Sequence, residues 1–423
     1  MSFLAKVSPI HLLRRAFTRV INIESIPAFD KYDHLSNMES KDLFQFEPFS
    51  DEDHIAFPRE QPGKDYDLNW SLANEWFTVW GNAYRNPDRS LLMSHLKCVR
   101  DKCGNAFCKR TYVSDCDVPS LTSDFEELSD EVKEFLSKVP NLYVEDAAVC
   151  SGRLLETRIR SVTNDPATAL LLKNMLHRMP LRHPQTPHPL SLIVARGLSR
   201  PFTAIGEDLH SRSLTVLVGG EVSPRLILRS LATATAQVFD AERGRVEMAA
   251  GESNTPPIKG PISKCILPCC TCIAASGDVK LAFGAAAKTA ITALAAENRL
   301  FCDGDTVLSR DGVSRVFAGV CCDGEKLEKL GKLGKLGKPG EGEMVLNQKV
   351  YRAVEGDNLL VMPNEVFFVE NEGEEGMLSD GKEVLDKLGK YIGNDEYAAF
   401  AMERLQNAVF RTIHGDSLEK LLK

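Results

Sequence analysis

The residues best suited to do chemistry follow two short apolar segments, residues 278–283 and 300–302. Gly284 follows the first segment and three alanines lead from it to Lys288 and Thr289. Such a glycine, ahead of a helix, is typical of phosphate-binding loops, because the free N–H groups at a helix N-terminus attract anions. An aspartate after the next strand is a second mark of nucleotide-binding domains. The stretch therefore predicts a phosphate- or nucleotide-binding unit, with the candidate residues Gly284, Ala285, Ala286, Ala287, Lys288, Thr289 and Asp303.

The motif departs from that of a working phosphate loop. The P-loop pattern is G-x-x-x-x-G-K-[ST], in which the lysine and the hydroxyl contact the phosphates and magnesium. Here no second glycine precedes Lys288 and Thr289, and the pair comes too soon after Gly284. The Ala- and Leu-rich composition predicts a helix over residues 289–298. The alternative hypothesis is an ordinary strand followed by an Ala-rich helix in an α/β core.

Composition limits the class of protein. The chain has 423 residues, of which 43% are hydrophobic and 26% charged, which is typical of a globular protein large enough for two domains. Its net charge of −8 argues against non-specific coating of nucleic acid, although it is compatible with recognition of one RNA end. No apolar run reaches the roughly 18 residues that a membrane span needs.

The cysteines predict no metal site and no disulfide framework. Twelve are scattered along the chain, and Cys98, Cys103, Cys108 and Cys116 lack the C-x-x-C spacing of zinc sites. We therefore expect reduced thiols.

Residues 1–22 predict a mitochondrial transit peptide. They contain Lys6, Arg14, Arg15 and Arg19, have no acidic residue, and could place their apolar side chains on one face of a helix. The alternatives are an ordinary N-terminal helix or an interfacial anchor. The transit peptide implies localisation in the mitochondrial matrix.

The rest of the chain divides into an extended acidic segment at 23–68, a first domain at 69–210 and a second domain at 211–423. The K-L-G repeats at 325–342 predict a low-complexity insertion in the second domain.

Local signals predict several elements inside these domains. Alternation over residues 75–84 predicts a strand pair closed by Gly81 and Asn82. Asp165 and Pro166 are expected to begin a helix, as an N-cap residue and the first helical residue. Residues 381–423 are expected to be mostly helical.

Several segments follow the order of motifs in one enzyme family, and over residues 70–322 the chain resembles ATP-dependent phosphoenolpyruvate carboxykinase. The segments are residues 142–147 (L-Y-V-E-D-A), Thr163, Lys173-Asn174-Met175 with Arg178, Gly219-Gly220-Glu221, Cys269-Cys270, Gly277-Asp278-Val279, Phe283-Gly284 with Thr292, residues 300–303, and Tyr84-Arg85-Asn86-Pro87, which is similar to the family's substrate loop.

The resemblance implies an α/β fold with two lobes and a P-loop-like mononucleotide-binding domain. Arg85 keeps its place in the substrate loop, and Asp303 keeps the first of two paired aspartates. Loss of one donor that stabilises the transition state typically costs two to three orders of magnitude in rate, so the chain is expected to be a pseudoenzyme. Five positions that carry donors in the family are occupied by Pro224, Cys269, Ala290, Ile291 and Gly304.

The function predicted from the sequence is that of a non-catalytic subunit that binds a nucleoside triphosphate or the 5′-triphosphate of an RNA. In character the chain is similar to the guide-RNA-associated proteins of trypanosomatid mitochondrial RNA editing, which implies RNA and a paralogous protein partner in a heterodimer. One alternative is a structural subunit of a mitochondrial complex such as the ribosome. Another is a residual ATP-dependent carboxykinase or kinase that uses Lys288, Thr289, Asp303 and Asp305. No catalytic residue, metal ligand or further cofactor is assigned.

Overall fold

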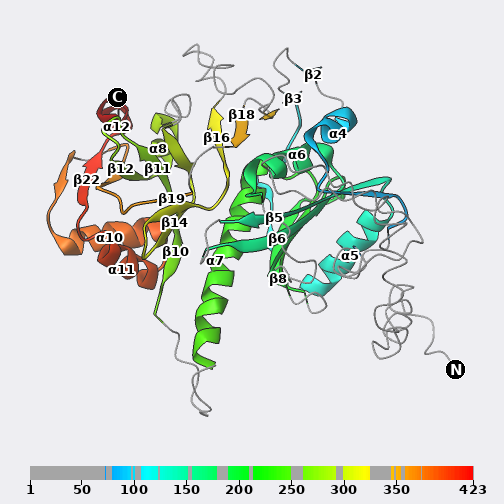
Figure 1. Cartoon of the computed structure of the whole chain (residues 1–423), viewed down its shortest axis with the longest axis horizontal. Coiled ribbons are helices and arrows are strands. Elements are labelled where there is room, and N and C mark those ends of the chain that lie inside the picture. The colour runs from blue at the N-terminus through cyan, green and yellow to red at the C-terminus, as the bar shows by residue number, and fades with distance from the viewer. Residues whose placement is uncertain are drawn as a thin grey trace, which may run out of the picture.

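The chain folds into an α/β structure with several sheets (Figure 1). A computed structural model describes residues 72, 79–96, 99–100, 106–121, 124–150, 155–178, 189–208, 213–248, 261–291, 299–323, 344–346, 349–353, 358–372 and 374–422. The expected transit peptide at 1–22, the acidic segment at 23–68 and the insertion at 325–342 lie outside these residues.

The largest sheet has seven strands in the order β1-β5-β6-β7-β9-β8-β4. Its central strands β7 and β9 are parallel, and nearly all their residues are buried, as expected for strands covered on both faces. The strands are β1 (Asn82–Arg85), β4 (Ser120–Leu121), β5 (Asn141–Val149), β6 (Thr157–Thr163), β7 (Leu190–Ala195), β8 (Phe202–Glu207) and β9 (Leu214–Gly219).

Helices cover both faces of this sheet (Figure 1). Side chains alternate along β7, so Ile193 packs towards α5 while Leu192 and Val194 pack towards α6 and α7. The short helix α4 packs against α6. These helices are α4 (Arg89–His95), α5 (Phe125–Ser137), α6 (Pro166–Met175) and α7 (Pro224–Met248), and a 3₁₀ turn, η3, covers Asp115–Asp117.

A second sheet has six strands in the order β13-β11-β12-β20-β22-β21. Helices α8 and α12 share an apolar cluster with one face of the sheet, and α10 and α11 share a cluster with the other face. The elements are β11 (Cys269–Ile273), β12 (Val279–Phe283), α8 (Ala285–Ile291), β13 (Leu300–Asp303), β20 (Glu365–Val369), β21 (Gly376–Leu378), α10 (Gly381–Ile392), α11 (Asp395–Arg404), β22 (Val409–Ile413) and α12 (Gly415–Leu422).

Two smaller sheets complete the described part of the chain. One has the order β10-β14-β15-β19, and the other, β16-β18-β17-β3-β2, pairs segments from early and late in the sequence. Their strands are β2 (Val99–Arg100), β3 (Ala106–Cys108), β10 (Lys264–Leu267), β14 (Thr306–Ser309), β15 (Val313–Arg315), β16 (Gly319–Asp323), β17 (Met344–Leu346), β18 (Lys349–Ala353) and β19 (Leu359–Leu360).

Backbone hydrogen bonds join the seven-stranded sheet and its helices to the later sheets. The Cys150 N–H donates to the Val316 carbonyl, and the Ala318 N–H donates to the Met175 carbonyl, each at 2.7 Å. Val316 also belongs to the same apolar core as α6 and α7. The two parts of the described structure are therefore packed together around a shared core.

Strand pairing contradicts two expectations from the sequence. The domain boundary at 210/211 falls too early, because β9 pairs with β7 and β8 inside the seven-stranded sheet. Asn82 begins a strand that pairs in parallel with β5 and does not close a hairpin. The expectation that residues 381–423 are mostly helical is confirmed by α10, α11 and α12, although β22 lies among them and pairs with β20 and β21. The expected helix start at Pro166, capped by Asp165, is confirmed.

Candidate functional site

Gly284 alone connects β12 to α8. Its φ is +109°, and a Cβ atom there would lie 2.4 Å from the Val369 carbonyl oxygen, so the turn requires glycine. The predicted helix start at Thr289 is wrong: α8 begins at Ala285, because alanine is the strongest helix former and the alanines join the helix. The order strand, glycine, helix is confirmed, but no open phosphate loop separates the two elements; residues 292–298 lie outside the described part of the chain.

The structure brings Lys288 and Asp303 together. Both β12 and β13 are antiparallel to β11, so they run in the same direction, and the register aligns Ala282, Cys270 and Asp303 across the sheet. Lys288 on α8 lies over this edge, and its Nζ donates to Asp303 Oδ2 at 2.8 Å. Burial lowers the pKa of Lys288, but the Asp303 carboxylate outweighs burial and raises the pKa above its ordinary value. The ammonium group therefore stays charged, and 40% of the side chain remains exposed.

Two arginines of α7 belong to the same electrostatic cluster. Burial raises the pKa of Asp305 to about 6, helped by Asp303 and opposed by Lys288, Arg229 and Arg225. Arg225 and Arg229 are four residues apart on one exposed face of the helix. Neither side chain forms a hydrogen bond or an ion pair with a described residue, although the Arg229 carbonyl accepts from the Thr233 hydroxyl. The start of α7, α8 and the end of β13 thus gather three cations around two carboxylates, which we call the Lys288 cluster: Lys288, Arg225, Arg229, Asp303 and Asp305.

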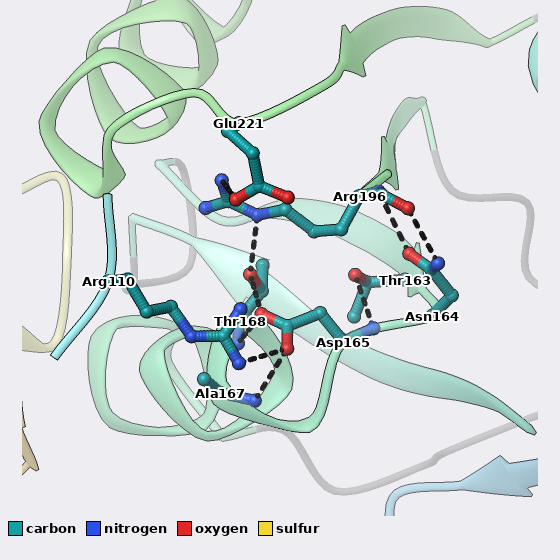
Figure 2. Close-up of polar contacts among 8 residues, drawn as sticks. All are labelled: Arg110, Thr163, Asn164, Asp165, Ala167, Thr168, Arg196 and Glu221. Carbon is teal, nitrogen blue, oxygen red and sulfur yellow. Dashed lines mark hydrogen bonds and ion pairs between the residues drawn. The ribbon is translucent and has the colours of Figure 1, made fainter. Parts of the chain in front are cut away.

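A second polar network fixes the turn before α7. Figure 2 shows Arg196, at the end of β7, extended between Glu221 and Thr168. Its Nη1 lies 3.3 Å from Glu221 Oε2, and its Nε donates to Thr168 Oγ1 at 3.4 Å. Asn164 holds the Arg196 backbone through two hydrogen bonds of 2.8 and 2.9 Å. The Gly219-Gly220-Glu221 turn, and with it the start of α7, is thereby tied to the ends of β6 and β7.

Asp165 is the other centre of this network (Figure 2). Its carboxylate accepts hydrogen bonds from the Thr168 N–H at 2.9 Å and the Ala167 N–H at 3.4 Å, which caps α6. Arg110 Nη2 donates to the same carboxylate at 2.7 Å. Arg110 and Asp165 therefore neutralise each other, and this part of the network is structural.

Tyr112 and Tyr351 link the two networks. The Arg196 guanidinium lies 5.2 Å from the Tyr112 ring centre, and burial raises the pKa of Tyr112 to about 12. Tyr351 is hydrogen-bonded to the opposite residue Cys321, and its hydroxyl group is sensitive to the charges of both Tyr112 and Asp303. Tyr351 thus lies within electrostatic reach of both groups of residues.

The positions that carry donors in the carboxykinase family are apolar here. Ala290 and Ile291 are 7% and 0% exposed and pack in the core beneath α8. Cys269 is buried, which raises the pKa of its thiol well above the ordinary value, and Pro224 is the first residue of α7. Among the described residues no three His, Cys, Asp or Glu side chains are grouped so as to hold a metal ion.

Arg85 lies in the seven-stranded sheet, whereas Lys288 lies on α8, which packs on the six-stranded sheet. Arg85 is buried in β1, where its Nη1 is 3.8 Å from Asp146 Oδ2, and Arg160 Nε donates to the same carboxylate at 2.7 Å. Arg85 is therefore part of a buried ion-pair cluster in the seven-stranded sheet. The Thr289 side chain lies outside what the structure describes.

The prediction that all cysteines are reduced is wrong at Cys108, which is disulfide-bonded. The pairing of β3 with β2 forms a hairpin, and such pairing brings together positions whose sequence spacing is unremarkable. Nine other described cysteines are free thiols.

The sequence analysis missed Arg225, Arg229 and Arg196. A local signal existed for the first two, because their spacing of four follows a Gly-Gly turn and the helix has no acidic residue in its first turn. Arg196 gave no signal, because its partners are distant in sequence.

In the described part of the chain, no helix is long and apolar enough to span a membrane. No protein-family model matches the chain, and no curated protein matches its sequence.

Proposed function

We propose that the chain is a non-catalytic protein that binds a triphosphate group, on a nucleotide or at the 5′ end of an RNA, at the Lys288 cluster. The observation that carries this proposal is the charged Lys288, whose side chain is 40% exposed, together with two exposed arginines whose side chains form no ion pair with any described residue. Lysine and arginine are the principal phosphate-binding side chains. The cluster also lies where parallel-running strands end, which is where α/β proteins bind ligands.

The apolar residues at the donor positions support the proposal that the chain does not catalyse nucleotide turnover. Turnover of a nucleotide needs charged groups that stabilise the transferred phosphoryl group, whereas Ala290 and Ile291 are packed in the core. We infer a pseudoenzyme similar to phosphoenolpyruvate carboxykinase, with two lobes and a P-loop-like domain. Its setting would be a mitochondrial RNA-processing assembly, in which it acts beside a protein partner.

In this proposal Asp303 competes with the ligand for Lys288. In the free protein the Asp303 carboxylate is paired with the Lys288 ammonium group. A phosphate must therefore displace this carboxylate or share the lysine with it. A highly charged triphosphate does this more readily than a monophosphate, because attraction grows with ligand charge. The two members of the ion pair should therefore affect binding in opposite directions.

The test is a fluorescence titration of the full chain with a labelled short RNA that carries a 5′-triphosphate or a 5′-hydroxyl. We expect preference for the triphosphate, reversed by ATP. Lys288→Gln should weaken triphosphate binding about 10- to 100-fold, and Asp303→Asn should strengthen it about tenfold. Lys138→Gln, at an exposed lysine paired with Glu134 on α5, is the matched control and should change nothing. Equal binding of both RNAs, or no binding, would overturn the proposal; the second result would favour a structural subunit.

A further inference from the structure

One face of α7 is exposed, basic and free of acidic residues. Arg225, Arg229, Thr233 and Gln237 are exposed at intervals of four, while Ile227, Leu231 and Val238 are buried on the opposite face. The first acidic residue of the helix is Asp240. We call these four exposed residues the α7 row. Such a face stands out in a chain that has 59 acidic and 51 basic residues.

The cations near the other end of α7 differ from those of the row. Arg243 pairs with Glu396 at 3.0 Å, and Lys264 pairs with Glu242 at 2.8 Å. Those charges are neutralised within the protein and tie α7 to neighbouring elements. Arg225 and Arg229 make no such pairs with described residues, so their charge remains available to an external anion.

The row starts in the first turn of α7. The charges of Arg225 and Arg229 both lower the pKa of Asp305, so this end of the row is within electrostatic reach of the Lys288 cluster. From there the row extends over 12 residues, or about 18 Å along the helix axis. Figure 1 shows α7 as a long helix that runs from the junction of the two parts to the edge of the molecule. A ligand that starts at Lys288 and follows the row would have an extended, repeating anionic chain.

We propose that the α7 row binds the sugar-phosphate backbone of a single-stranded RNA, with Arg225 and Arg229 on successive phosphates. This inference rests on the proposed function, since it gives the path of the RNA away from its 5′ end. A guanidinium group binds a phosphate through two parallel hydrogen bonds. Gln237 adds an uncharged donor for phosphates and sugar hydroxyls. The Thr233 hydroxyl already donates to the Arg229 carbonyl at 3.0 Å, so it can only accept a hydrogen bond from a sugar hydroxyl.

The experiment measures the salt dependence of RNA binding by the full chain and by the double variant Arg225→Gln/Arg229→Gln. The probes are RNAs of about 4 and 12 nucleotides, a length range typical of single-strand sites, each with a 5′-triphosphate or a 5′-hydroxyl. Each lost phosphate contact lowers the slope of log K against log salt by about 0.7 for a single strand, so the double variant should lose about 1.4. The loss should occur with both 5′ ends, because backbone contacts do not require the triphosphate.

A second double variant, Lys138→Gln/Arg200→Gln, removes the same charge from exposed residues that pair with Glu134 and Glu131 on α5. Its salt slope should equal that of the wild type. If the salt slope of the arginine double variant falls only with triphosphate RNA, the arginines contact only the 5′ end. That result would refute backbone binding by the α7 row and would leave the proposed function intact. An equal loss in both double variants would also overturn it, because only net charge would matter. Absence of a triphosphate preference in the wild type would instead count against the proposed function.

Discussion

Replacement of His177 should make the protein more resistant to acid. His177 follows α6, is 8% exposed, and exchanges two backbone hydrogen bonds of 2.9 Å with Ala148. Burial, and to a lesser extent the charge of Arg315, lower the pKa of its imidazole to about 4, although hydrogen bonds with the backbone of Arg315 and Val316 oppose the shift. The residue therefore stays neutral in the folded protein at a pH where the unfolded chain would already bind a proton.

The magnitude follows from the two pKa values. An unfolded histidine titrates near 6.5, so between about pH 6.5 and 4 the unfolded state binds more protons than the folded state. Stability is therefore lost as the pH falls through this window and is fully present above it. One pKa unit corresponds to about 1.4 kcal/mol, which gives a total of about 3 kcal/mol and a loss of about 2 kcal/mol by pH 4.5.

The assay is urea unfolding of the wild type and His177→Gln at pH 7 and pH 4.5. Glutamine keeps an N–H donor but does not titrate. The wild type should lose about 2 kcal/mol more than the variant between the two pH values, whatever the substitution costs at pH 7. Equal losses in the two proteins would refute the reasoning, because His177 would then be protonated, or accessible, in the folded state.

Two further predictions concern the candidate site. Gly284→Ala should lower the free energy of unfolding by about 2 kcal/mol or more, because the new Cβ meets the Val369 carbonyl oxygen and φ is positive. Urea unfolding measures this cost. A cost below about 0.5 kcal/mol would show that the turn relaxes. Asp305→Asn should stabilise the protein by about 3 kcal/mol at pH 8 and by less than about 1 kcal/mol at pH 4. The pKa of Asp305 in the folded protein, about 6, lies above the ordinary 3.8, so the wild-type protein becomes less stable as the pH rises through that interval. A gain in stability that is the same at both pH values would contradict this reasoning.

Elements marked by local chemistry were predictable from the sequence. Asp165 and Pro166 carry the capping and first-turn preferences of a helix start, and α6 begins there. Gly284 marks the only turn residue between β12 and α8. The start of α8 was not predictable in the same way, because the P-loop comparison assigned the alanines to a loop while their intrinsic propensity favours helix.

Interactions that depend on strand pairing were not predictable. Lys288 and Asp303 were both candidates, but their ion pair depends on β11, which lies between β12 and β13 and aligns Cys270 with Asp303. The same limit applies to β22, whose place between β20 and β21 is set by partners distant in sequence. Arg85 has a side chain suited to anion binding, but its sheet position gives it Asp146 as a partner.

The core beneath α8 opposes the placement of a lysine at position 290, where the resemblance to carboxykinase would place the phosphate-binding lysine. Ala290 is 7% exposed and packs with Ala287, Ile291 and Cys270. A lysine placed there would bury an ammonium group among these apolar side chains, and a buried charge is costly. We expect Ala290→Lys to lower the free energy of unfolding by about 3 kcal/mol or more and to produce no nucleotide turnover.

Ala290→Met is the matched control, because it adds similar bulk without charge. If Ala290→Met costs much less than Ala290→Lys in urea unfolding at pH 7, charge burial causes the difference; the cost of lysine should also fall if ATP binds the variant. A lysine variant as stable as the methionine variant would show that position 290 opens to solvent. Position 290 could then hold a charged lysine side chain, and this result would count against the proposal of triphosphate binding without turnover.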